Sequence, residues 1–194
     1  MNNTKGVQSI LLVGVGGQGT ILISKILSAG FMQRGYDVKM SEIHGMSQRG
    51  GSVTTQIRYG DKVYSPTIGM GEADVIIAFE KAEALRALPY LKKGGIMIMD
   101  DYEIYPMPVL TGKAEYPSGA VEAISDAGVE PIVIKAAEIA EGLGNVRAQN
   151  IVLLGALVKA WDLGDIEWES LIREYVPAKA TDINLRAYAA GRDL

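Results

Sequence analysis

The stretch "LLVGVGGQGT", residues 11–20, decides the fold, because an apolar run enters a cluster of glycines there. The run over residues 7–14 is short, β-branched and apolar, which is typical of a parallel strand buried on both faces. Residues 19–35 then repeat apolar side chains at helical spacing, and Gly35 is expected to end that helix. A strand, a glycine turn and a helix in this order predict the first unit of an α/β sheet.

The same alternation continues along the chain. Further strands are expected at 36–43, 52–60, within 62–73, and at 74–80, 94–101 and 131–136. Helices are expected at 81–91, 145–161 and 167–175. This order predicts a three-layer α/β/α fold with a largely parallel, Rossmann-like sheet and C-terminal helices. The sheet becomes mixed if 52–60 forms a hairpin with the strand within 62–73. Since no repeat or linker interrupts the chain, residues 1–194 are expected to form one domain.

The amino-acid composition of the chain disfavours or excludes several classes of function. Apolar residues make up 48% of the chain and the net charge is −4, which does not favour nucleic-acid or anionic-membrane partners. Without cysteine, the chain cannot form disulfides, thiolate-bound iron–sulfur clusters or a cysteine nucleophile. One histidine cannot build a multi-histidine metal site, and no metal is expected. The N-terminus has no signal-peptide pattern and no apolar run could span a membrane, so a cytoplasmic protein is expected.

The glycine cluster has two interpretations. Gly14, Gly16 and Gly19 spell G-x-G-x-x-G, and the helix that follows would present unpaired N–H groups to an anion. A dinucleotide site also needs an acid near the end of the second strand to hold a ribose, and Glu42 is near that place. The alternative is that another phosphate or carboxylate uses the same helix start.

A second segment, "SEIHGMSQRGG" at 41–51, is richer in chemistry. It follows a strand, where ligand crevices of open α/β sheets lie. Arg49 could bind a carboxylate or phosphate in a bidentate manner, and His44 is a candidate for proton transfer. The plainer interpretation is a local Glu42–Arg49 salt bridge with His44 bonded to backbone. Ordering so many glycines and polar groups is costly without a ligand or partner, which favours function.

Two other stretches have structural and functional interpretations. The helix at 145–161 is apolar nearly all round, so it is either core or a subunit interface, and core is favoured. Asp100 and Asp101 end a strand and could bind a metal, but adjacent carboxylates there more often cap turns.

The motifs "GVGGQG" and "SEIHGMSQRGG" resemble the gamma-type domain of 2-oxoacid:ferredoxin oxidoreductases, and among these the small (beta) subunit of indolepyruvate ferredoxin oxidoreductase. The stretches "NIVLLGAL" (150–157) and "NLRAYAAG" (184–191) are similar to helices of the same family, so the resemblance covers nearly the whole chain.

The resemblance implies oxidative decarboxylation of a 2-oxoacid to an acyl-coenzyme A with thiamine diphosphate, with electrons passing through iron–sulfur clusters to ferredoxin. It places thiamine diphosphate and the clusters on a larger partner subunit, makes coenzyme A a co-substrate, and leaves no cofactor bound by this chain alone. It carries over two loops that contact a cofactor or the partner protein. The first consists of Gly14, Gly16, Gly17, Gln18 and Gly19, and the second of Ser41, Glu42, His44, Gly45, Ser47, Gln48, Arg49 and Gly50. All of these except Ser41 and Gly45 are candidates for cofactor binding. His44 and Arg49 are the catalytic candidates.

Two alternatives to this function are a stand-alone oxidoreductase that binds NAD(P) or a flavin, and a purely architectural subunit. The first rests on the glycine motif and Glu42. The second would leave no residue of this chain in the active site.

Overall fold

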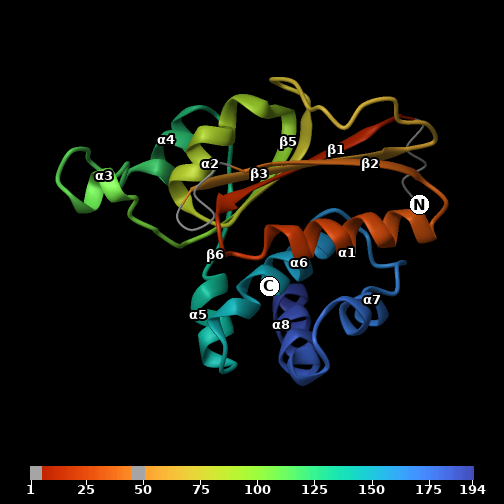
Figure 1. Cartoon of the computed structure of the whole chain (residues 1–194). Helices are drawn as coiled ribbons and strands as arrows, with labels where there is room; N and C mark the ends of the chain where they lie inside the picture. The colour runs from red at the N-terminus through yellow and green to blue at the C-terminus, as the bar shows by residue number, and fades with distance from the viewer. Residues whose placement is uncertain (1–5, 45–50) are drawn as a thin grey trace.

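The computed structural model describes residues 6–44 and 51–194, which form a six-stranded sheet with helices on both faces (Figure 1). The strands are β1 (Gln8–Val15), β2 (Asp37–His44), β3 (Ser52–Gly60), β4 (Ala73–Ala78), β5 (Leu91–Asp100) and β6 (Ile132–Ile134). Their order across the sheet is β2-β3-β1-β4-β5-β6. β1, β4, β5 and β6 pair in parallel, whereas β3 is antiparallel to both β1 and β2. The expected three-layer fold with a largely parallel, mixed sheet is confirmed.

The centre of the sheet is formed by the most apolar strands. Every residue of β4 is buried, and so is every residue of β1 after Gln8. Helices cover both faces here, so continuous apolar runs suit these strands better than alternation would. Ile10 of β1 pairs with Val75 of β4, and Val75 pairs with Ile96 of β5.

The antiparallel strand β3 forms its hairpin with a different strand from the one expected within 62–73. β3 forms its hairpin with the preceding β2, and residues 61–72 form a loop without a strand. This loop is instead held by side chains of the sheet. The Asp37 carboxylate accepts from the Val63 N–H at 2.9 Å, and Gln56 Oε1 accepts from the Ile68 N–H at 2.6 Å. Because these contacts satisfy the loop backbone, it does not need a ladder of its own.

Helices form a thick layer on one face and a thin one on the other (Figure 1). The thick layer contains α1 (Thr20–Gln33), α5 (Ala136–Gly142), α6 (Gln149–Ala160), α7 (Trp168–Tyr175) and α8 (Thr181–Asp193). The thin layer contains α2 (Lys81–Ala87) and α4 (Ala120–Asp126). Short 3-10 turns occur at Leu88–Tyr90, Val146–Ala148 and Ala178–Ala180. Separate apolar clusters fill the two sides of the sheet. Gly35, with φ at 83°, follows the end of α1 as predicted.

α6 belongs to the hydrophobic core, which was the favoured interpretation of the helix expected at 145–161. Its first ten residues are all buried. It crosses α8 so closely that a Cβ at Gly191 would lie 2.0 Å from the Val152 carbonyl oxygen. Within residues 6–44 and 51–194, no helix is long and apolar enough to cross a membrane.

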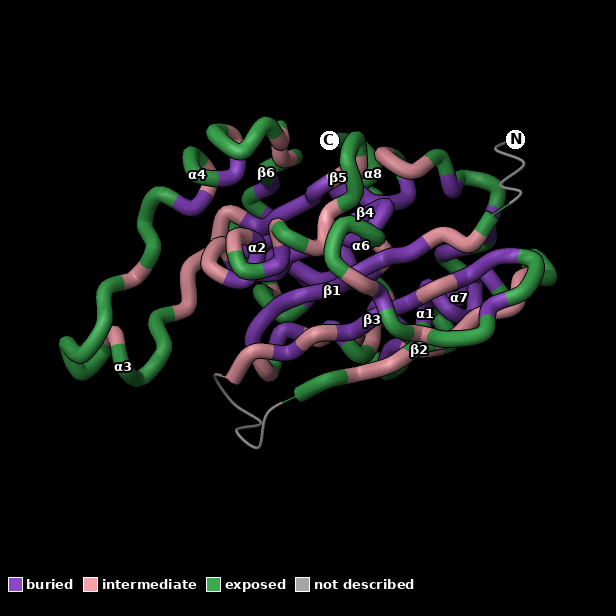
Figure 2. Tube along the Cα trace, turned by 90° about the horizontal axis from the view of Figure 1, so that it is seen from above, coloured by how far each residue is buried: buried purple, intermediate pink, exposed green. Residues whose placement is uncertain are grey.

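A projecting segment separates β5 from α4. We define residues 102–119 as the arm; it contains the short α3 (Met107–Leu110) and extends away from the sheet (Figures 1 and 2). Its surface is largely exposed (Figure 2). The arm returns to the body at α4, whose Ile124 packs into the thin-layer core.

Candidate functional site at the carboxyl edge of the sheet

Strand direction brings the two sequence motifs together. β1, β2, β4, β5 and β6 all end at one edge, which we name the carboxyl edge, and the antiparallel β3 begins there. The Gly16 N–H donates to the Gly51 carbonyl at 2.9 Å, and Val15 pairs with Ser52. The glycine turn therefore lies beside the C-terminal end of the 41–51 segment. The juxtaposition on which the sequence-based hypothesis depends is present.

The glycines of the turn have distinct physical roles. Gly17 and Gly19 have φ of 106° and 81°, where L side chains are strained. A Cβ at Gly14 would lie 2.9 Å from Gln18 Oε1, and one at Gly19 would lie 2.3 Å from Asn150 Nδ2. Gly14 and Gly19 thus permit close packing of the turn against Gln18 and α6.

Gln18 belongs to the scaffold of the site. Its side-chain Oε1 accepts from the Val15 N–H at 2.8 Å, and its Nε2 donates to the Phe79 carbonyl at 2.6 Å. The carboxamide therefore ties the end of β1 to the end of β4. α1 leaves β1 on one face and α2 leaves β4 on the other, so this is the switch point at which open α/β sheets bind nucleotides. Gln18, which is 7% exposed and lies between the two strand ends, fills that place.

Glu42 and His44 lie on the face of the sheet that α1 covers. Ser24 of α1 donates its hydroxyl to Glu42 Oε1 at 3.3 Å. β3 separates β2 from β1, so Glu42 lies two strands, on the order of 10 Å, from the glycine strand. In a dinucleotide fold the acid-bearing strand is next to the glycine strand. His44, at the end of β2, is exposed.

The remaining candidates of the second motif, Gly45, Ser47, Gln48, Arg49 and Gly50, lie outside the described residues. The proposed Glu42–Arg49 salt bridge is outside them for the same reason. The described residues on either side of them, His44 and Gly51, are both on the carboxyl edge.

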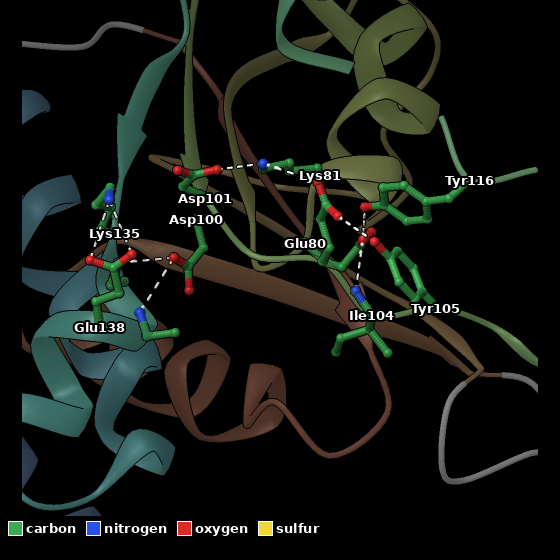
Figure 3. Close-up of polar contacts among 12 residues, drawn as sticks. Glu80, Lys81, Asp100, Asp101, Ile104, Tyr105, Tyr116, Lys135 and Glu138 are labelled. Carbon is green, nitrogen blue, oxygen red and sulfur yellow. Dashed lines mark hydrogen bonds and ion pairs between the residues drawn. The ribbon is translucent and has the colours of Figure 1, made fainter. Parts of the chain in front are cut away.

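Glu80, directly before α2, and Glu83 within it are buried, although the charged pattern of residues 79–88 is typical of a solvated helix face. Glu80 caps α2 by accepting from the Glu83 N–H at 2.9 Å, and its other oxygen accepts from Ile104 N–H and the Tyr116 hydroxyl (Figure 3). Glu83 accepts from the Ser52 hydroxyl at 2.6 Å and pairs with Arg86 at 2.7 Å. Burial raises the pKa of Glu83. The sequence signal was an acid directly after a buried strand, "IIAFE".

Asp100 accepts hydrogen bonds from the first backbone N–H groups of α5. Its Oδ1 accepts from the Ala136 N–H at 2.9 Å and from Ala137 N–H at 3.4 Å (Figure 3). Oδ2 is buried and has no partner among the described residues. Burial raises the pKa of Asp100 to about 7. Asp101 pairs with Lys81, and no cluster of three metal-ligating side chains occurs in the part of the chain that the structure describes. The turn-capping interpretation is correct for Asp100.

The pairing of the charged side chains at the carboxyl edge determines which of them could bind an anionic ligand. Lys81 pairs with Asp101 and Glu103, and Arg86 pairs with Glu83, so these cations are already neutralised. Arg147 is exposed and, among the described residues, forms no ion pair. It stands three positions before Asn150, whose Nδ2 donates to the Gly19 carbonyl at 3.3 Å. An anion at the turn would therefore meet the backbone N–H groups at the start of α1.

Comparison with known proteins assigns the chain to a family. Residues 9–194 match a model of the pyruvate ferredoxin/flavodoxin oxidoreductase family, and the chain belongs to that family. It is 39% identical over 190 residues to the indolepyruvate oxidoreductase subunit IorB of Thermococcus kodakarensis, covering 94% of this chain and 93% of that one.

Solved structures show the same fold. The gamma subunit of a keto/oxoacid ferredoxin oxidoreductase from Geobacter sulfurreducens PCA superposes with a TM-score of 0.69 at 22% identity, covering 96% of each chain. A 2-oxoglutarate:ferredoxin oxidoreductase from Magnetococcus marinus, with 2-oxoglutarate, coenzyme A and succinyl-CoA bound, superposes with a TM-score of 0.76 at 22% identity. The match covers 97% of this chain and 31% of the longer Magnetococcus marinus chain. The resemblance found in the sequence is confirmed by the family match and by the identity to IorB.

Proposed function

We propose that this chain is the small subunit of an indolepyruvate-type 2-oxoacid:ferredoxin oxidoreductase and that its carboxyl edge completes the reaction centre of a larger subunit. The complex would oxidatively decarboxylate a 2-oxoacid to an acyl-coenzyme A and pass electrons to ferredoxin. The observation that carries the proposal is the Gly16–Gly51 hydrogen bond, which places both family motifs on one edge. Close similarity to IorB over nearly the whole chain supports the substrate class.

The larger subunit would hold the redox groups. The chain has no cysteine, so iron–sulfur clusters must be held elsewhere. Thiamine diphosphate needs a metal for its pyrophosphate, and we assign it to the larger subunit as well. Thiolate-bound clusters favour a reducing compartment, which agrees with a cytoplasmic location. We also propose that residues 1–194 act as one domain.

Coenzyme A is the ligand that we propose for this edge. Coenzyme A carries phosphate groups, so its binding site must supply donors to phosphate oxygens. Arg49, Arg147 and the N–H groups at the start of α1 are donors of this kind. Gly14, Gly16, Gly17, Gln18 and Gly19 would form the supporting turn. Glu42, His44, Ser47, Gln48 and Gly50 would contact coenzyme A, thiamine diphosphate or the larger subunit. His44 and Arg49 are the side chains most suited to proton transfer and to anion binding.

The test is reconstitution. The chain alone, the larger subunit alone and the mixture are assayed for indolepyruvate-dependent reduction of ferredoxin in the presence of coenzyme A. Turnover is expected only in the mixture, and a fully active lone chain would refute the proposal.

Arg49→Ala tests the site within the assembled complex. A rise of about tenfold in the KM for coenzyme A is expected, since a charge-assisted contact contributes on the order of 1.5 kcal/mol. Arg173→Ala, an exposed arginine on α7, is the matched control and should behave as wild type. If Arg49→Ala changes assembly but leaves kcat and KM unchanged, the chain is an architectural subunit.

A further inference from the structure

The arm presents an apolar tip to solvent. Met107 is 67% exposed, Leu110 is 64% exposed and Tyr105 is 49% exposed. No residue from 104 to 112 carries a charge. Exposed apolar side chains are ordinary when scattered, but these three are concentrated on one projecting segment (Figure 2).

The base of the arm is held in place by buried polar contacts. Glu80 accepts from Ile104 N–H at 3.2 Å on the outgoing segment and from the Tyr116 hydroxyl on the returning one (Figure 3). The Lys81 N–H donates to the Tyr102 carbonyl at 3.0 Å. Tyr105 and Tyr116 pack edge to face with ring centroids 5.0 Å apart. Both ends of the arm are therefore attached to the start of α2.

The arm is also stiffened along its length. Pro106, Pro108 and Pro117 restrict its backbone, which lowers the entropy lost when the tip is ordered against a partner. Between the arm and α2 lies a cavity of about 570 Å³, whose lining includes Val15 and Ser52 of the carboxyl edge. The base of the arm therefore faces Val15 and Ser52 across this cavity.

We propose that the arm tip inserts into an apolar groove on the larger, thiamine diphosphate-carrying subunit and anchors this chain with its carboxyl edge against the reaction centre. This inference rests on the proposed function. Methionine and aromatic side chains are enriched at the centres of interfaces, and a rigid, uncharged projection fits a concave apolar surface. Two projecting tips are not complementary to each other, so a second copy of this chain would have to receive the tip at a different surface.

The experiment compares two double variants that carry the same kind of change. Met107→Asp/Leu110→Asp places charges on the tip. Tyr64→Asp/Met70→Asp places them on residues that are 89% and 76% exposed in the 61–72 loop, at the opposite edge of the sheet. Binding of each purified chain to the larger subunit is measured by isothermal titration calorimetry, and folding of each free chain by circular dichroism. The tip variant should bind at least about tenfold more weakly, with an unchanged melting temperature, and the loop variant should bind as wild type.

Other results overturn the inference in identifiable ways. Wild-type affinity in the tip variant would exclude the arm as an anchor, and equal weakening in both variants would show a non-specific charge effect. A change in the chain's own oligomeric state, measured by sedimentation, with unchanged binding would make the tip a self-association surface. If the wild-type chain does not bind the larger subunit at all, the proposed function itself fails. Should the charged tip variant unfold, Leu110→Ala provides the same comparison.

Discussion

Asp100 is a fully buried carboxyl group that holds the start of α5 through Oδ1, while Oδ2 has no partner among the described residues. Burial disfavours the ionised form, and this raises its pKa from 3.8 to about 7. The folded state therefore binds the Asp100 proton more tightly than the unfolded state does. The contribution of protonated Asp100 to folding stability is fully present below the pKa that this group has in the unfolded chain. It is lost as the pH rises to about 7.

Asp100→Asn should remove this pH dependence. Asparagine can still accept from the Ala136 N–H but does not ionise. We expect the free energy of unfolding of wild type, relative to the variant, to fall by a few kcal/mol between about pH 4 and pH 7. Urea denaturation across this range measures it. Asp126→Asn, at an exposed site on α4, is the control. A constant difference between wild type and Asp100→Asn would contradict the assignment.

Gln18 shows what a single residue's sequence context cannot reveal. The glycine motif predicted the turn correctly, and with it the strand and helix on either side. It did not reveal that the Gln18 carboxamide links β1 to β4, because Phe79 is 61 residues away in the chain. Hydrogen bonds over such separations depend on strand order, which no local pattern encodes.

At the scale of elements, the contact between α6 and α8 depends on glycine. A Cβ at Gly155 would lie 2.3 Å from the Tyr188 carbonyl oxygen, and one at Gly191 would lie 2.0 Å from that of Val152. Both obstructing atoms belong to backbone, so neither can move without displacing a helix. The absence of side chains at these two positions allows the helix axes to approach.

Gly191→Ala should therefore be strongly destabilising, by about 2–3 kcal/mol, because the added methyl group overpacks a helix crossing. Gly142→Ala is the matched control, since a Cβ there meets nothing within 4 Å, and its stability should be equal or slightly higher. Thermal melting of both variants measures the effect, and a drop of roughly 5–10 °C is expected for Gly191→Ala alone. Equal melting temperatures would show that α8 shifts freely.

Element prediction succeeded where a segment's own side chains determine its environment. β1, β4 and α6 are predominantly apolar, so their burial could be predicted from the sequence. The expected strand within 62–73 was wrong because Asp37 and Gln56 hold that loop from the sheet. α4 was missed because the proline-rich arm precedes it and only Ala120 and Ile124 anchor it.

For the whole molecule, strand order decides which ligands the glycine turn can serve. The antiparallel β3 lies between β1 and β2, and this displaces Glu42 from the place where it would hold a ribose. Gln18 fills the switch point. Both features disfavour the stand-alone NAD(P) or flavin enzyme that the motif alone leaves open.

We expect no saturable binding of NADH, NADPH or FAD to the purified chain in the micromolar range, measured by ligand fluorescence. Binding to a known dehydrogenase under the same conditions is the positive control. Micromolar affinity that Glu42→Ala abolishes would revive the dinucleotide function and count against the strand-order argument.

The sequence by itself determined the α/β/α class, the central strands, the long buried helix and the family, since each rests on local apolar periodicity or on contiguous motifs. Only the tertiary structure decided the insertion of β3 between β1 and β2, the linking role of Gln18 and the attachment of the arm to Glu80. These features arise from hydrogen bonds between residues far apart in the chain. A buried polar group is stabilised by a hydrogen-bond partner, and the packing of the whole sheet determines which residue lies close enough to be that partner.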